Sequence, residues 1–109
     1  MKITDVAFGV TDWSLVAPTI HPGTTGHATW RTVERGNVRV RMVEYSANYL
    51  ADHWCQRGHV VLVLSGELIS ELEGGPSVTL TPGMSYEVAD GASSHRSRTE
   101  KGATLFIVD

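Results

Sequence analysis

Apolar and polar residues alternate in short runs along most of the chain, and clusters of Gly, Pro, Asn and Asp separate these runs. This pattern is typical of short β-strands joined by tight turns. It predicts strands over residues 29–33, 38–45, 59–64, 67–73, 78–80, 85–88 and 104–108. Strands at this spacing indicate an all-β sandwich or a closed barrel.

Three segments give the pattern more detail. In residues 38–45 the alternation places Val38, Val40 and Met42 on one face and Arg39, Arg41 and Val43 on the other. The dense apolar run 59–64 is typical of a strand buried on both faces. Residues 14–28 carry two prolines and two glycines with little periodicity, so we interpret residues 1–28 as an arm and residues 29–109 as the barrel of a single domain.

Residues 47–57 allow a second interpretation. Apolar side chains recur there at helical spacing, and Gly58 could end the helix. The residues concerned are Ala47, Leu50, Ala51, Trp54 and Cys55. Local pattern alone leaves this helix as an alternative to an extended segment.

Composition narrows the class of protein. The chain has 109 residues, of which 41% are hydrophobic and 19% are charged, and its net charge is -3. These values fit one globular domain, and the absence of a Lys/Arg cluster argues against a nucleic-acid partner. The beginning of the sequence lacks a long apolar run, so we expect a cytoplasmic protein with no membrane segment. Cys55 is the single cysteine, which excludes a disulfide within the chain.

The strongest candidate chemistry lies around that cysteine. His53, Cys55 and His59 fall within seven residues, yet a straight strand would separate the two histidines by about 20 Å. A reversal at residues 56–58 with Gly58 in the turn would place Cys55 opposite His59 at about 5 Å. His53 would share the face of Cys55, because side chains two residues apart in a strand do so. On a helix such residues do not share a face.

The spacing His53-x-Cys55-x3-His59-x6-Gly66 resembles the first motif of the cupins, G-x5-H-x-H-x3,4-E-x6-G. The second cupin motif is matched more loosely by Pro82-Gly83 and by Gly91-x3-His95, with His95 at the place of its His. The segments 52–59 and 102–109 are also similar to those of the small DHCW-motif cupins. The resemblance implies a jelly-roll barrel, known as a double-stranded β-helix, with ligands in its mouth and often a dimer.

The resemblance also implies a metal site formed by His53, Cys55, His59 and His95. Cys55 replaces a histidine of the motif and His59 replaces its glutamate, so the usual manganese or iron chemistry of the family is in question. Imidazole and thiolate ligands favour zinc, with nickel, copper or iron as alternatives. The competing interpretation is a pair of hydrogen-bonded histidines beside an inert buried thiol. No catalytic residue is assigned.

Several other side chains receive weaker interpretations. Arg39 and Arg41 are expected at a solvent-facing strand edge, with a pocket wall as the alternative. Trp54 is expected to face outward, Asp52 away from the ligands, Tyr45 and Tyr86 toward the pocket, and His21 and His27 toward solvent. The chain is expected to be a small metal-binding cupin with an inward-facing His/Cys site, and the first hypothesis for its function is a metal-dependent enzyme acting on a small molecule in the barrel mouth. The alternatives are a non-catalytic metal- or ligand-binding module and a structural barrel.

We also expect a homodimer, because edge strands of a small barrel need cover and the arm could supply it.

Overall fold

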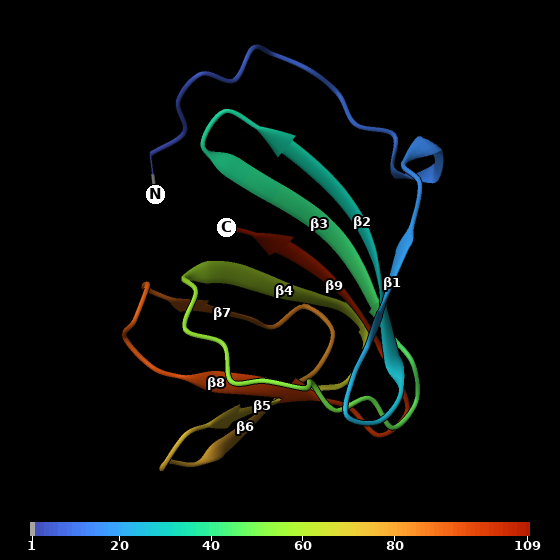
Figure 1. Cartoon of the computed structure of the whole chain (residues 1–109), viewed down its shortest axis with the longest axis vertical. Coiled ribbons are helices and arrows are strands. Elements are labelled where there is room, and N and C mark those ends of the chain that lie inside the picture. Colours follow the sequence, from blue (N-terminus) through green and yellow to red (C-terminus); the bar gives the residue numbers. More distant parts are fainter. Residues whose placement is uncertain (1) are drawn as a thin grey trace.

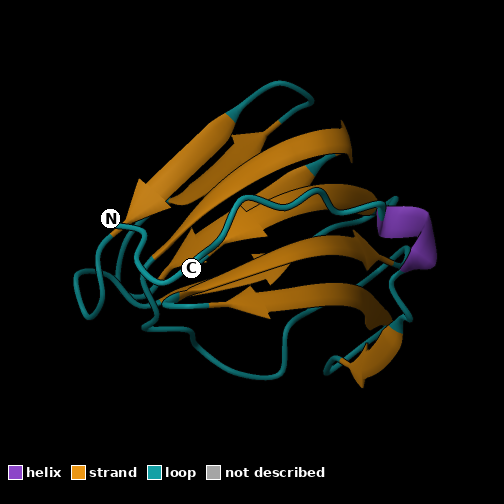
Figure 2. Cartoon of the chain, turned by 90° about the horizontal axis from the view of Figure 1, so that it is seen from above, coloured by secondary structure: helices purple, strands orange, loops and turns teal. Residues whose placement is uncertain are grey.

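A computed structural model describes residues 2–109 and shows an all-β chain, as predicted (Figures 1 and 2). These residues form nine strands and one short 3-10 helix, η1 (Trp13–Leu15). The strands are β1 (Thr19–Pro22), β2 (His27–Arg35), β3 (Val38–Tyr45), β4 (His59–Gly66), β5 (Leu68–Leu72), β6 (Ser77–Leu80), β7 (Ser85–Val88), β8 (His95–Arg98) and β9 (Ala103–Val108). Among residues 2–109, no helix is long and apolar enough to cross a membrane.

The strands form two antiparallel sheets that face each other (Figure 1). The larger sheet has the order β1-β2-β3-β9-β4-β7, and the smaller has the order β6-β5-β8. The crossovers between non-consecutive neighbours, such as β3 with β9 and β9 with β4, bring distant parts of the chain side by side. Residues near position 40, position 60 and the end of β9 therefore meet in one sheet.

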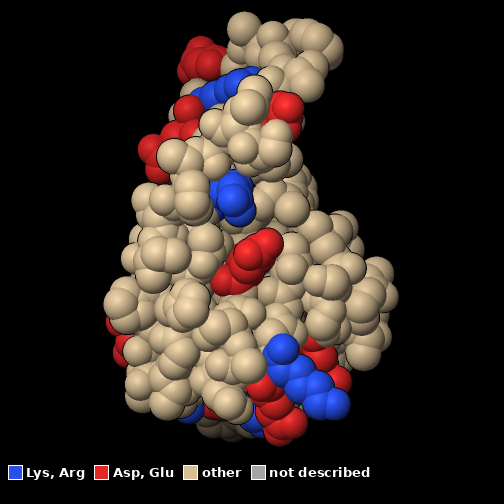
Figure 3. Space-filling model, turned by 90° about the vertical axis from the view of Figure 1, so that its right-hand side faces the viewer, with Lys and Arg blue, Asp and Glu red and all other residues tan. Residues whose placement is uncertain are grey.

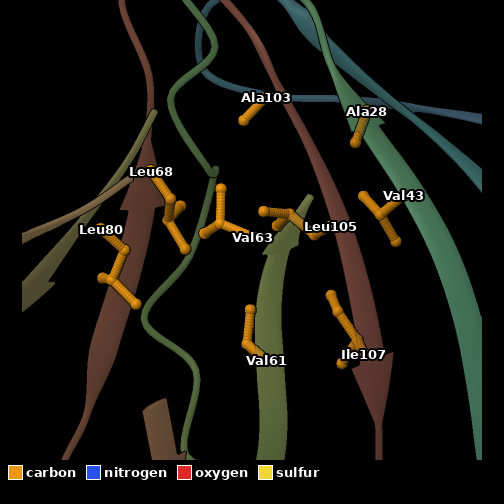
Figure 4. Close-up of a cluster of buried hydrophobic side chains, with 9 residues drawn as sticks. All are labelled: Ala28, Val43, Val61, Val63, Leu68, Leu80, Ala103, Leu105 and Ile107. Carbon is orange, nitrogen blue, oxygen red and sulfur yellow. The ribbon is translucent and has the colours of Figure 1, made fainter. Parts of the chain in front are cut away.

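Alternate residues of the central strands fill the space between the sheets (Figure 4). Leu105 on β9 lies in register with Val43 on β3 and with Val63 on β4, and all three side chains are almost fully buried. Apolar side chains in one row across three strands remove a continuous surface from water, which is the main stabilising contribution of such a core. The remaining members of the cluster are Ala28, Val61, Leu68, Leu80, Ala103 and Ile107.

The same register corrects two predictions about faces. Arg41 lies opposite Ile107 and is buried, so the inward face of β3 is the one that carries Arg39, Arg41 and Val43. The predicted solvent-facing edge was wrong for these arginines. Strand β4 is also not buried on both faces, because Val60 and Leu64 are 37% and 43% exposed. Its apolar run reflects one core face and one half-covered outer face.

The segment before the barrel is more regular than predicted. Residues 19–22 form β1, which pairs with β2, so this part is an edge strand of the larger sheet and not an arm. Residues 2–12 do follow an irregular path outside the two sheets (Figure 1). Figure 3 shows the molecule narrowing toward its upper end, and most of the surface in that view is uncharged.

Residues 47–57 do not form the alternative helix. The segment runs beside β8 and uses its main chain for pairing: Ala51 N–H donates to Ser97 O at 2.9 Å, and Leu50 bridges to Arg98. Strand β8 already pairs with β5 on its other edge, so this irregular segment satisfies the free edge. Main-chain pairing with a strand from residues 95–98 outweighed the helical spacing of the apolar side chains.

Candidate metal centre

Cys55 is held against the first residue of β8. Its N–H donates to His95 O at 2.7 Å, and His95 N–H donates to Cys55 O at 3.0 Å. Two residues that exchange both hydrogen bonds in an antiparallel pair point their side chains to the same face. Both side chains here line the cavity between the sheets.

His59 approaches the same point from the larger sheet. It is the first residue of β4, and its Nε2 lies 2.9 Å from Nε2 of His95. The candidate ligand atoms of Cys55, His59 and His95 all lie within 4.8 Å of one another. The structure thus brings together three of the four predicted ligands, two from the side of the smaller sheet and one from the larger.

The route by which Cys55 and His59 meet differs from the predicted one. Cys55 pairs with His95 and not with His59, so residues 56–58 are not a hairpin turn. Gly58 instead lies close to the turn before β8, since a Cβ there would be 2.7 Å from Asp90 N. The hydrogen bond from Gly58 N–H to the Asp90 carboxylate fixes this approach. Gly58 is therefore required for close packing and not for a left-handed turn.

His53, the fourth predicted ligand, lies outside this three-residue group. Its imidazole Nδ1 is 2.6 Å from a carboxylate oxygen of Asp52, and both side chains are mostly exposed. The chain bends at residues 52 and 53, so the strict alternation that would align His53 with Cys55 is lost. His53 still lines the rim of the cavity.

The surroundings of the two histidine rings prepare them as ligands. His95 Nδ1 is 2.8 Å from the carbonyl oxygen of Ser93, which requires an N–H at Nδ1 and turns the Nε2 lone pair toward the cavity, where it accepts the 2.9 Å hydrogen bond from His59 Nε2. Burial, followed by the nearby His95, lowers the pKa of His59 to about 4, so this ring is neutral. Neutral imidazole is the form that binds metals.

The Nδ1 side of the His59 imidazole ring faces a carboxylate. Its Nδ1 is buried without a hydrogen bond and lies 3.8 Å from Oδ2 of Asp109. Asp109 is 1% exposed and receives two hydrogen bonds from Arg39 and one from Arg41. Carboxylates beside a ligating histidine orient its ring and tune its basicity. Sequence reasoning missed Asp109, because only the register of β9 against β3 places it here.

A cavity of about 400 Å³ opens beside the three ligands. Tyr45 and Tyr86 line it, as predicted, and the Tyr86 hydroxyl lies 3.1 Å from His59 Nε2. Burial raises the pKa of both phenols, so both stay protonated and can donate. The hydroxyl of Tyr86 is thus a neutral proton donor beside the ligand cluster.

Trp54 and His21 have partners that the sequence did not reveal. Arg96 stacks on the Trp54 ring at 4.6 Å and donates a 2.7 Å hydrogen bond to Glu71 on β5. This stack ties the Cys55 segment to the smaller sheet. His21 stacks on Trp30 with ring centroids 3.8 Å apart, so it is not simply solvated, whereas the side chain of His27 is exposed as expected.

No family model matches the chain, and no curated protein matches it. Solved structures do. An RmlC-like cupin from Shewanella frigidimarina aligns with a TM-score of 0.74 at 14% identity, over 96% of this chain and 92% of that one. A predicted oxalate decarboxylase from Thermotoga maritima gives 0.74 at 13% identity, over 92% of this chain and 96% of that one. Ectoine synthase from P. lautus gives 0.72 at 21% identity, over 93% and 76%.

Proposed function

We propose that this chain, which has the cupin fold, binds one transition-metal ion through Cys55, His59 and His95 and uses it on a small molecule in the barrel. The observation that carries the proposal is the convergence of three ligand atoms within 4.8 Å. Ligands that each lie about 2.0–2.3 Å from one ion are separated from each other by roughly 3–4 Å, so small side-chain movements would complete the site.

The donor set favours zinc. One thiolate and two imidazoles form a mixed sulfur and nitrogen site, which suits zinc best and nickel or iron as alternatives. The side chain of His95 is already in the tautomer that presents Nε2, through its contact with Ser93 O at 2.8 Å. A carboxylate ligand is not among the three, in contrast to the cupin motif that the sequence resembles.

The number of protein ligands separates two functions. Three protein ligands would leave one coordination position free, and a zinc ion held by Cys55, His59 and His95 would supply Lewis acidity to a small molecule in the cavity. The Tyr86 hydroxyl, 3.1 Å from His59 Nε2, would then hold or donate a proton beside that position. Some proteins of this fold are named as enzymes, ectoine synthase among them, so the fold accommodates catalysis. We therefore favour a metal-dependent enzyme.

The second candidate is a metal-binding module without catalysis. It is favoured by the place of His53 on the rim of the cavity, from which it could become a fourth ligand. To do so it would have to give up its 2.6 Å contact with Asp52. Four protein ligands would close a tetrahedral site and favour a structural role.

Metal analysis of matched histidine variants tests both candidates. Protein purified without a nickel column should contain about one zinc per chain, and His59→Ala, His95→Ala and Cys55→Ala should each lose most of it. His27→Ala is the control, since His27 is exposed and far along the chain from the cluster. Retention of metal in the His53→Ala protein indicates the open site, whereas its loss indicates the closed one. Full metal content in His59→Ala and His95→Ala would contradict the shared site.

We also propose the homodimer. Its support is the exposed apolar surface of residues 3–15, where Phe8 is 98%, Leu15 83% and Val10 81% exposed. Exposed apolar side chains in one segment are typical of a surface that a partner covers. Light scattering at about 100 μM should give twice the monomer mass. A chain lacking residues 2–11 should give the monomer mass at the same concentration, and an intact chain that stays monomeric would refute the dimer.

The resemblance to the DHCW-motif cupins and a cytoplasmic location complete the proposal. Cys55 forms no disulfide, and a cysteine that ligates a metal as a thiolate is stable in a reducing compartment, which supports this location. Fractionation of cells expressing the natural gene, followed by detection of the chain, tests the location directly.

A further inference from the structure

A cluster of charged side chains occupies the cavity on the far side of His59. Asp109 is surrounded by Arg39, Arg41 and Arg57, whose nearest nitrogens lie 2.8, 3.0 and 3.6 Å from its carboxylate. One carboxylate thus faces three guanidinium groups, and the site carries surplus positive charge. Because Asp109 and Arg41 are 1% and 7% exposed at their side chains, water screens this surplus poorly. An anion entering from outside would offset it.

Arg41 is the arginine with unused hydrogen-bonding capacity. Arg39 uses Nε and Nη2 on both oxygens of Asp109, at 2.8 and 2.9 Å. Arg41 donates only from Nη2, and its Nε is buried without a partner. A buried donor left unpaired is costly, and a bound acceptor would offset that cost. Arg41 lines the cavity, so an acceptor there would lie beside its guanidinium group.

The guanidinium of Arg41 is held in a fixed position. It lies 4.4 Å from the centroid of the Trp30 ring, and the Trp30 ring is itself stacked on His21 at 3.8 Å. A cation packed on an aromatic face has lost most of its freedom before any ligand arrives. The donor is therefore preorganised.

The cavity is of small-molecule size, and part of its wall is apolar. Its volume of about 400 Å³ falls within the roughly 300–1,000 Å³ typical of small-molecule pockets. Val43, Val61 and Leu105 contribute to its walls. An occupant is therefore expected to carry an apolar body together with its charge.

We propose that the cavity binds a small organic carboxylate, whose carboxylate group accepts hydrogen bonds from Arg41 while Arg57 supplies positive charge at the mouth. The planar fork of arginine matches a carboxylate, and Asp109 already presents that group to Arg39 and Arg41. The proposal deepens the proposed function by naming a ligand class, and it rests on that function only for the role of the ion. The anion site uses the side of His59 that carries Nδ1, whereas Nε2 faces the metal ligands.

The test uses metal-free protein and two probes of equal shape. Benzoate and benzamide differ in charge but hardly in size, and binding is followed by the NMR signal of the Arg41 Nε–H group. We expect benzoate to bind at least about tenfold more tightly than benzamide and to shift that signal. Arg41→Gln should remove this preference. Arg35→Gln is the matched control, because Arg35 is exposed at the end of β2 and should leave both affinities unchanged.

The outcomes distinguish a carboxylate site from a general anion site and from the proposed metal site. Equal affinity for benzoate and benzamide would overturn it, and so would displacement of benzoate by an equal concentration of inorganic phosphate, which would indicate a general anion site. If Arg41→Gln does not fold, Arg57→Gln replaces it, because Arg57 is 54% exposed at its side chain and should cause a several-fold loss for benzoate alone. Benzoate binding by a chain that binds no zinc supports the anion site and refutes only the metal site.

Discussion

Cys55 and His95, forty residues apart in the chain, exchange both of their main-chain hydrogen bonds, at 2.7 and 3.0 Å. This pair fixes the thiol and one imidazole on the same face, so that only His59 has to be supplied by the other sheet. The ligand cluster therefore depends on pairing between an irregular segment and β8, more than on the spacing of the three residues in the sequence.

The first prediction concerns the reactivity of Cys55. A thiolate bound to an ion is masked from thiol reagents, and removal of the ion exposes a half-buried nucleophile in a folded protein. Labelling of native, zinc-loaded protein should therefore be slow, and a chelator should accelerate it while the far-UV circular dichroism spectrum stays unchanged. Equal rates with and without chelator would show that Cys55 is buried but is no ligand.

The second prediction concerns Asp109. Asp109→Asn removes the carboxylate beside His59 Nδ1 and leaves Arg39 and Arg41 without their counter-charge. We expect zinc affinity, measured by competition with a chromophoric chelator, to fall about tenfold or more. The free energy of unfolding should fall by roughly 3–5 kcal/mol, because breaking a buried ion pair leaves uncompensated charge.

Asp12→Asn provides the comparison for that variant. Asp12 is an exposed acid that accepts hydrogen bonds from Ser14 at the start of η1, away from the cavity. Its replacement should cost no more than about 1 kcal/mol and leave zinc affinity unchanged. A folded Asp109→Asn protein that binds zinc as tightly as Asp12→Asn would exclude a role of Asp109 in positioning His59.

The third prediction is a dependence of stability on pH through Glu71. The hydrogen bond from Arg96, together with the charges of Arg96 and Arg98, holds the pKa of Glu71 below its ordinary value of 4.5. The folded state thus binds fewer protons than the unfolded state below pH 4.5, and stability falls as pH falls through this range. The side chains of Arg96 and Glu71 keep 29% and 19% of their surface exposed, so solvent screens the pair in part and the loss is expected to be about 1 kcal/mol.

Urea unfolding of wild type and Glu71→Gln at neutral and acidic pH measures this contribution. The variant should be less stable than wild type at neutral pH, and the difference should shrink on acidification. Arg96 also stacks on Trp54. The tryptophan fluorescence of the wild-type protein should therefore change over the same pH range as its stability. A stability difference that is constant with pH would mean that the ion pair contributes nothing.

The fourth prediction concerns the core row. Leu105 is 1% exposed and lies between Val43 and Val63 in neighbouring strands. Leu105→Ala should lower the free energy of unfolding by about 2–5 kcal/mol, since it removes buried methyl groups and leaves a cavity. Val78→Ala, at a position 45% exposed on β6 and outside the proposed dimer surface, should change it by about 0.5 kcal/mol. Similar losses in both variants would contradict the assigned core.

Much of the fold could be predicted because strand periodicity is a local property. The alternation in residues 38–45 and the strand at 85–88 both appear in the structure. The side of the strand that faces inward is not local, however. Arg39 and Arg41 read as a polar edge, and only pairing with β9 and Asp109 places them inside.

In the candidate site, too, the features that depend on local sequence were predicted and those that depend on sheet pairing were not. The convergence of Cys55 and His59 was predicted, but through a hairpin that does not exist. His95 came from the resemblance to the cupins, since nothing near it in the sequence predicts that it reaches Cys55. Asp109 carries no motif at all. Contacts that depend on sheet register over forty or more residues leave no local pattern to detect.

His59 belongs to the larger sheet and His95 to the smaller one, and this has a consequence for exchange kinetics. An ion shared between them would connect the two layers at the mouth of the barrel. Because its ligands come from both layers, separation of the layers, or detachment of the segment that carries Cys55 from β8, would speed its release. The residence time of the ion would then depend on the opening rate of the barrel. We expect solutes that slow this opening to prolong metal retention, even where the equilibrium affinity of the ligands is unchanged.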